Sequence, residues 1–170
     1  MSLTSDIDLL KQVSFFNDFD NDQLRLLAFG AEMRAYRAKQ VIFRQGDLAD
    51  SGFVITEGQV RMTISANGFD VQSQILGAGS LIGEMALMAE TRRSAMATAI
   101  EDVRVIQIRR VTFRRVMDEY PDLAAIIHDR IAGRLAGLVG DLELVRSKLG
   151  NDSEEVMSLE EVESFVQRDH

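Results

Sequence analysis

Residues 60–73 read VRMTISANGFDVQS and contain two alternating runs of apolar and polar residues. Apolar residues occupy every second position from Val60 to Ile64, and the alternation resumes at Phe69. Between the runs stands Ala66-Asn67-Gly68, and both Asn and Gly tolerate the positive φ of a tight turn. The stretch therefore predicts two antiparallel strands joined by a short hairpin turn.

Further short β-rich runs lie on both sides of this hairpin, separated by glycines or by acidic turns. They cover residues 41–44, 53–56, 94–100 and 103–108. Many short strands at even spacing are typical of a closed or double-sheet β structure. We therefore expect a sandwich, barrel or jelly roll over residues 32–108.

Helical patterns flank the β-rich region. The polar turn at residues 20–22 precedes a short apolar stretch, which predicts an N-cap and a helix over 23–28. Beyond Arg110 the spacing predicts one helix over 111–119 and a longer one over 123–149. The long helix carries one apolar stripe: Ile127, Ile131, Leu135, Leu138, Leu142, Val145 and Leu149.

The apolar stripe of helix 123–149 predicts a homodimer. At 1.5 Å per residue this helix is about 40 Å long, more than a single β structure can cover. From Leu135 onward the spacing is close to a heptad seam, so a second copy is the expected partner. Three glycines, Gly133, Gly137 and Gly140, would permit a close helix contact or a ligand-dependent shift.

Composition excludes several classes of function. The chain has no cysteine, and its two histidines are His128 and His170, so we expect no metal site and no cysteine nucleophile. Acidic residues outnumber basic ones by 27 to 19, with seven of the acids in residues 151–170, so the surface does not suit a nucleic-acid backbone. No apolar run is long enough to span a membrane, and no secretory signal is visible, so we expect a cytoplasmic protein.

Residues 81–95, LIGEMALMAETRRSA, combine a glycine, a carboxylate and two arginines. Glycine lets the backbone approach a ligand closely, and residues 85–88 can form one helical turn that favours an anion. Arg93, nine residues after Glu84, can return to the same place and add a charge-assisted hydrogen bond, with the Ser94 hydroxyl as a further donor. A carboxylate beside an anion site suits a ligand whose hydroxyls lie next to its phosphate, as in a nucleotide.

At these residues the sequence resembles the cyclic nucleotide-binding domain family. Residues 82–87 and 93–95 match the family's phosphate-binding cassette, approximately F-G-E-[LM]-A-L-x(5)-R-[AST]-A. A second family pattern, with a Gly-Asp pair followed by an apolar strand and a further glycine, is matched by residues 42–60. The resemblance covers about residues 10–148.

The resemblance implies a mainly β, α+β fold. This is an eight-stranded antiparallel β-roll, or double-stranded β-helix jelly roll, with N-terminal helices, a short phosphate-cassette helix and a long C-terminal helix. The binding domain would occupy residues 1–150, with the last helix acting in dimerisation and as a ligand lid. An acidic tail would occupy residues 151–170.

The resemblance also assigns the ligand contacts. It implies that Glu84 accepts hydrogen bonds from the ribose 2′-hydroxyl and that Arg93 pairs with the cyclic phosphate. The remaining expected contacts are backbone or hydroxyl groups of Gly83, Met85, Ala86 and Ser94, with Met62 against the base and Leu138 in the lid.

Two features depart from the family pattern, and Ser94 bears on the choice of base. Arg92 stands where many relatives have proline, so the choice between the two arginines depends on spacing, which favours Arg93. Leu138 and Val139 occupy the positions at which the catabolite-activator branch has a polar pair that reaches the purine. Ser94 replaces a threonine typical of the guanine-selective branch, so we expect cyclic AMP in preference to cyclic GMP.

The sequence thus predicts a regulatory module, not an enzyme, that binds a cyclic nucleotide and moves its C-terminal helix in signal transduction. One alternative is a ligand-free β-roll that serves as a dimerisation or interaction protein. Another is the sensor fragment of a transcription regulator without its DNA-binding domain. Because residues 151–170 are acidic, we expect no DNA binding by this chain and an unidentified protein effector. A cupin-type enzyme is disfavoured because the predicted strands contain no histidine.

Overall fold

The computed structural model describes residues 3–132. The helices are α1 (Leu3–Lys11), the 3₁₀ turn η1 (Ser14–Phe16), α2 (Asn21–Phe29), α3 (Met85–Met88) and α4 (Arg110–Glu119), and residues 121–132 are also helical. The strands are β1 (Glu32–Tyr36), β2 (Val41–Phe43), β3 (Leu48–Ala49), β4 (Ser51–Glu57), β5 (Val60–Ala66), β6 (Phe69–Leu76), β7 (Leu81–Ile82), β8 (Thr91–Arg92), β9 (Met96–Ala99) and β10 (Val103–Arg109).

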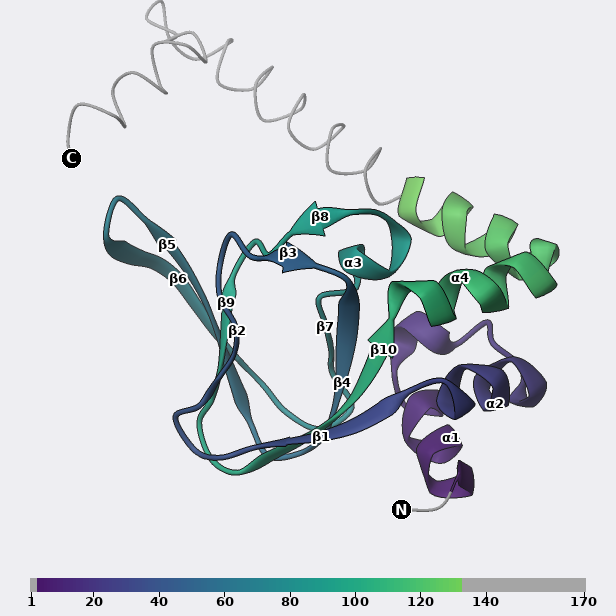
Figure 1. Ribbon diagram of the computed structural model, residues 1–170, viewed down its shortest axis with the longest axis horizontal. Coiled ribbons are helices and arrows are strands. Elements are labelled where there is room, and N and C mark those ends of the chain that lie inside the picture. Colours follow the sequence, from purple (N-terminus) through teal and green to yellow (C-terminus); the bar gives the residue numbers. More distant parts are fainter. Residues whose placement is uncertain (1–2, 133–170) are drawn as a thin grey trace, which may run out of the picture. The chain divides into compact units, whose positions relative to one another are not determined.

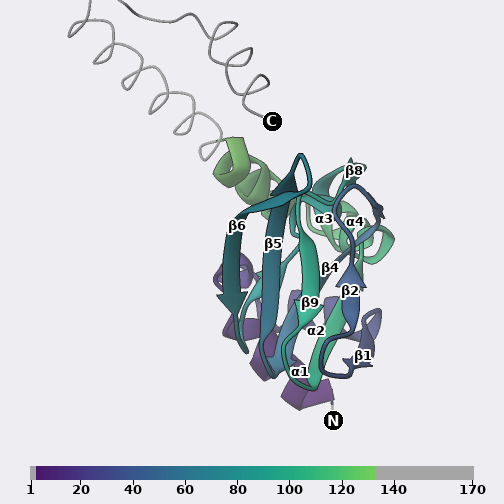
Figure 2. The same cartoon turned by 90° about the vertical axis from the view of Figure 1, so that its left-hand side faces the viewer.

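Two antiparallel sheets form the β-roll. One has the order β1-β10-β4-β7 and the other β2-β9-β5-β6, while β3 and β8 pair separately (Figure 1). Figure 2 shows β6, β5, β9 and β2 side by side, with β6 at the free edge of its sheet. The two sheets differ in their strands but share one apolar interior.

That interior is built from side chains of both sheets. Its buried members are Phe43, Phe53, Ile55, Val60, Ile82, Ala97, Ala99, Val103 and Val105. In β4 every residue except Glu57 is buried, and the strand lies between β10 and β7 in its sheet. The core therefore fixes the position of β7, which pairs with β4 and leads into residues 83–95.

A helical layer closes one side of the β-roll, where Figure 1 shows α1, α2 and α4 together. Four phenylalanine rings lie at its centre: Phe15, Phe16, Phe19 and Phe113, with centroids 5.1–6.3 Å apart in successive pairs. The start of α2 is fixed by a capping box in which Asp20 Oδ1 accepts from the backbone N–H of Gln23 at 2.8 Å.

The β-roll and the hairpin are confirmed. The turn between β5 and β6 places Asn67 at φ +54° and Gly68 at φ +83°, as a tight turn requires. The described residues form ten strands where eight were expected, and three of the ten, β3, β7 and β8, are pairings of only two residues each. A two-residue pairing is too short to produce an alternating pattern that sequence reasoning could detect.

The helical expectations have mixed outcomes. Helix 111–119 is confirmed as α4, and the residues from 123 to 132 are helical. The expected fold has N-terminal helices, but no range was predicted for α1, in which Ile7 and Leu10 are buried. Residues 133–149 of the long helix, with Leu138 and the three glycines, lie outside the described residues, as does the acidic segment 151–170.

Candidate functional site

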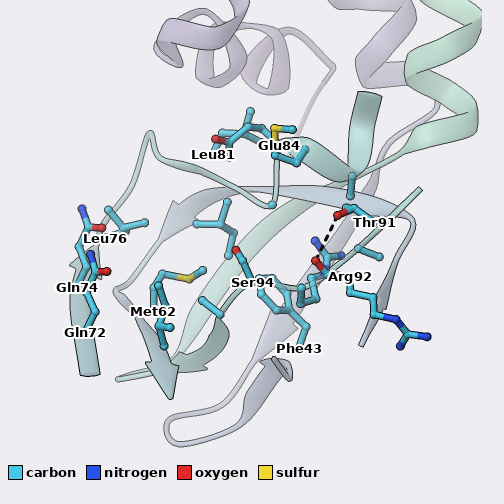
Figure 3. Close-up of a pocket in the computed structure, with 18 residues that line it drawn as sticks. Phe43, Met62, Gln72, Gln74, Leu76, Leu81, Glu84, Thr91, Arg92 and Ser94 are labelled. Atoms are coloured by element: carbon cyan, nitrogen blue, oxygen red, sulfur yellow. Dashed lines mark hydrogen bonds between the residues drawn. The ribbon is translucent and has the colours of Figure 1, made fainter. Parts of the chain in front are cut away.

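The β-roll contains a cavity of about 330 Å³ at its open side, within the size range of small-ligand pockets (Figure 3). Its wall combines the β5–β6 hairpin with the segment that runs from β7 to the start of β9. The lining residues are Phe43, Ala49, Met62, Ile64, Gln72, Gln74, Leu76, Leu81, Ile82, Gly83, Glu84, Met85, Ala86, Thr91, Arg92, Arg93, Ser94 and Ala95. Every predicted site residue within 3–132 is among them.

Arg93 is the buried cation of this cavity, with 8% of its surface exposed. Its Nη2 donates to the backbone oxygen of Ser51 at 2.7 Å. Its guanidinium carbon lies 4.2 Å from the centroid of the Phe43 ring and 5.5 Å from that of Phe53. Nη1 is buried and has no hydrogen-bond partner among the described residues. A buried charged donor without a partner is costly, so Nη1 leaves one hydrogen bond of this guanidinium unmade.

Burial also perturbs the protonation equilibrium of Arg93. Desolvation lowers the pKa of its guanidinium, and the charges of Asp50 and Asp47 oppose this shift only in part. Neither aspartate makes an ion pair with Arg93 in the described residues, so the cavity keeps an incompletely compensated positive charge. An anionic group beside Nη1 would offset this desolvation.

Arg92 has a different environment from its neighbour. It is exposed, and its Nη1 donates to the backbone oxygen of Gly46 at 2.9 Å. This contact joins the loop before β3 to β8, next to the pairing of Leu48 with Arg92. The structure therefore distinguishes the two arginines: Arg93 is buried at the cavity, and Arg92 braces a surface loop.

The cassette backbone turns sharply at Gly83, whose φ is +73°. A Cβ atom at this position would collide with Nη1 of Arg93. Residue 83 must therefore be glycine both for its backbone conformation and for the approach of the arginine. The single turn α3 follows, with Ala86 buried and Met85 half-exposed at the cavity rim.

Glu84 and Ser94 complete the polar cassette side of the cavity. Glu84 is partly exposed, forms no ion pair within the described residues, and in Figure 3 lies beside Leu81. Ser94 is exposed and follows directly on Arg93. A carboxylate acceptor, a hydroxyl and a guanidinium are thus available around one cavity.

Arg110, at the start of α4, donates hydrogen bonds to the backbone of α3 and of the residue that follows it. Its Nη1 donates to the backbone oxygens of Ala49 at 3.0 Å, Ala89 at 3.1 Å and Ala86 at 3.4 Å. One cation thus connects the end of β3, helix α3 and helix α4. The sequence analysis did not indicate this role for Arg110.

The sequence also did not indicate Phe43, Gln72, Gln74 and Leu81 as cavity residues. Phe43 was expected within a strand, but its position under the arginine depends on the pairing of β2 with β9. The glutamines belong to the predicted hairpin, in which Met62 pairs with Gln74 and Ile64 with Gln72. That register could not be read from the alternation alone. Leu138, the expected lid residue, lies outside the described residues.

The sequence profile described as "Cyclic nucleotide-binding domain" matches residues 33–120. This chain belongs to the cyclic nucleotide-binding domain family. The match spans β1 to α4 and includes every cavity-lining residue. The cavity therefore lies within the part of the chain that matches the family.

Curated relatives of the family differ widely in length. The lysophospholipase NTE1 of Chaetomium globosum is 30% identical over 115 residues, which cover 66% of this chain and 8% of that protein. The cyclic AMP receptor protein of Thermus thermophilus is 30% identical over 136 residues, which cover 79% of this chain and 62% of that protein. A cGMP-dependent protein kinase of Drosophila melanogaster is 31% identical over 122 residues, 68% of this chain and 13% of that protein.

Solved structures of the family have the same fold. A cyclic nucleotide-binding-like protein from Brucella abortus is 39% identical with a TM-score of 0.61, covering 67% of this chain and 98% of that one. The catabolite activator protein of Thermus thermophilus is 28% identical with a TM-score of 0.65, covering 78% and 62%. Among residues 3–132, no helix combines the length and apolar character needed to cross a membrane.

Proposed function

We propose that this module binds cyclic AMP in the cavity around Arg93 and passes the binding event to its C-terminal helix. The observation that carries the proposal is the guanidinium of Arg93, buried at 8% exposure with Nη1 lacking a partner among the described residues. The cyclic phosphate supplies a charged acceptor for that atom. A sheltered arginine–phosphate hydrogen bond contributes about 1.5–3 kcal/mol to binding.

The other proposed contacts are those that the resemblance to the family implies, and all of these residues line the cavity. With the phosphate at Arg93, the Glu84 carboxylate accepts from the ribose 2′-hydroxyl, and Gly83, Met85, Ala86 and Ser94 add backbone or hydroxyl contacts. Met62, which lies on the hairpin and is partly buried, packs against the base. This arrangement uses the polar cassette for the sugar-phosphate and the apolar hairpin for the base.

Cyclic AMP is preferred over cyclic GMP on the strength of residue 94. A serine there replaces the threonine that the guanine-selective branch uses, so one side-chain contact typical of that branch is changed. The names of the relatives do not distinguish the two ligands, because one name refers to cyclic AMP and another to cyclic GMP. Leu138 would cover the base without reading its polar edge.

The output of the module is proposed to be its long helix. We expect residues 123–149 to form a homodimer seam and a ligand lid, and a protein effector to respond to their movement. On this proposal the binding domain occupies residues 1–150 and the acidic segment 151–170 makes no contact with the ligand. The lysophospholipase relatives show that a chain of this kind can match a small part of a much longer protein.

A thermal-shift panel with cyclic AMP, cyclic GMP, cyclic di-GMP and buffer tests the proposal. A ligand at 100 times its dissociation constant adds about 2.7 kcal/mol to the native state. We expect a clear stabilisation by cyclic AMP, a smaller one by cyclic GMP at equal concentration, and none by cyclic di-GMP. A panel without any shift at millimolar ligand would favour the ligand-free interaction protein.

Calorimetry on Arg93→Ala and Arg92→Ala tests the anion site itself. Loss of a phosphate contact worth about 1.5–3 kcal/mol weakens cyclic AMP binding by roughly 10- to 150-fold. Arg92→Ala is the comparison variant: Arg92 also lines the cavity, but it is exposed and its guanidinium donates to the Gly46 carbonyl, so a smaller loss is expected. A larger loss for Arg92→Ala than for Arg93→Ala would show that the anion binds elsewhere.

A further inference from the structure

Two glutamine side chains face the cavity from the edge strand β6. Gln72 pairs with Ile64 and Gln74 with Met62, and all four residues line the cavity. Figure 3 shows Gln72, Gln74 and Leu76 together on the hairpin side, with Met62 between them and the arginine region. Their amides therefore stand at the end of the cavity remote from the phosphate-binding cassette.

An irregularity in the hairpin puts these glutamines on the inner face. Next to the turn, Ser65 pairs with Asp70, but the following pair is Ile64 with Gln72, so Val71 has no partner and forms a bulge. Without this extra residue, Ile64 would pair with Val71 and Met62 with Ser73. Because side chains alternate between the faces of a strand, the bulge exchanges the whole inner set.

The bulge thus places Gln72, Gln74 and Leu76 on the cavity face in place of Val71, Ser73 and Ile75, and so brings two amides to an end of the cavity whose other side chains are apolar. Val71 and Ile75 are instead directed outward and are 60% and 52% exposed. The other hairpin residues that line the cavity are Met62, Ile64 and Leu76. All remaining charged or hydroxyl side chains of the wall belong to the segment 84–94, on the cassette side.

The chemistry of this end fits a heteroaromatic ring. The faces of a purine can pack on the apolar side chains, whereas its edge carries donors and acceptors that are costly to bury unpaired. A carboxamide offers one donor and one acceptor side by side. Adenine has a matching pair on each side of its 6-amino group, and glutamine uses this match when it reads adenine in nucleic acids.

We propose that Gln72 and Gln74 determine the base preference of the site by hydrogen bonding to the 6-amino edge of the purine. This inference rests on the proposed function, since it requires a cyclic nucleotide with its phosphate at Arg93. It assigns base selection to the edge strand of the β-roll, within residues 3–132. The covering helix then needs no polar group to distinguish bases.

The test compares cyclic AMP with the 3′,5′-cyclic monophosphate of purine riboside, which lacks only the 6-amino group. Dissociation constants are measured by calorimetry for the wild-type chain, Gln72→Leu, Gln74→Leu and the double variant. Both glutamines are exposed, so leucine is expected to leave the fold intact. Ser73→Ala is the matched control, because Ser73 lies between them on the same strand and does not line the cavity.

We expect the wild-type chain and Ser73→Ala to bind cyclic AMP about tenfold more tightly than the purine analogue, the equivalent of one hydrogen bond of about 1.4 kcal/mol. The double variant is expected to bind both ligands equally. A tenfold preference that survives in the double variant overturns the inference, as does a wild-type chain with no preference. Failure of the proposed function has a different signature, in which neither ligand binds the wild-type chain.

Discussion

Replacing Gly83 by alanine is expected to damage the anion site more than the fold. The substitution has two consequences that can be separated. An alanine at φ +73° occupies the left-handed region, which costs about 1–2 kcal/mol in folding free energy. Its Cβ also meets Nη1 of Arg93, so the guanidinium must leave its position over Phe43 and beside the Ser51 carbonyl.

Gly79 provides a matched control for the folding free energy that alanine costs at a positive φ. Its φ is +88°, and a Cβ built there has no described atom within 4 Å. Gly79→Ala is therefore expected to pay the same conformational cost without touching the arginine. For a chain of this size 1 kcal/mol corresponds to about 2–4 °C in Tm, so we expect Gly79→Ala to melt roughly 2–8 °C lower.

The two variants are expected to differ sharply in ligand affinity. Displacing Arg93 removes a charge-assisted contact worth about 1.5–3 kcal/mol, so Gly83→Ala is expected to bind cyclic AMP roughly 10- to 150-fold more weakly. Gly79→Ala is expected to retain wild-type affinity. Calorimetry and thermal melts on the same preparations provide both numbers. Equal affinity losses, or a Gly83→Ala chain with full affinity, would refute the assignment of Nη1 as the phosphate donor.

Three further outcomes are expected. Glu84→Gln weakens cyclic AMP in calorimetry and affects its 2′-deoxy analogue much less; equal losses would mean that Glu84 does not contact the hydroxyl. Arg110→Met, which removes the donor to three cassette and loop carbonyls, lowers affinity by about tenfold through loss of one or two hydrogen bonds, without altering the cAMP-to-cGMP ratio. Light scattering detects a wild-type dimer that Leu142→Asp converts to a monomer, and a monomeric wild-type chain at tens of micromolar contradicts the seam over 123–149.

Local chemistry was sufficient to predict the hairpin and the cassette. Asn67-Gly68 favours a tight turn because both residues accept positive φ, and the alternation on either side requires strands. The cassette could be recognised because Gly83, Glu84 and Arg93 stand at a particular spacing within a short segment. These features depend on neighbours in the chain, so a single sequence carries them.

The choice between adjacent arginines depended on long-range packing. Spacing favoured Arg93, and the structure supplies a physical reason: two phenylalanine rings, from β2 and β4, and the Ser51 carbonyl surround its guanidinium. These partners lie about 40–50 residues away in the sequence. The role of Arg110 at the cassette was missed for the same reason, because its carbonyl partners are distant in sequence.

The inner face of β6 was decided by tertiary structure alone. An unbroken hairpin from the predicted turn would direct Val71 and Ile75 into the cavity, in agreement with simple apolar burial. The bulge at Val71 reverses this and places Gln72 and Gln74 on the face that lines the cavity, because one inserted residue changes the face of every residue beyond it. Alternation in the sequence shows that a strand has two faces, but only the register against β5 determines which face lines the pocket.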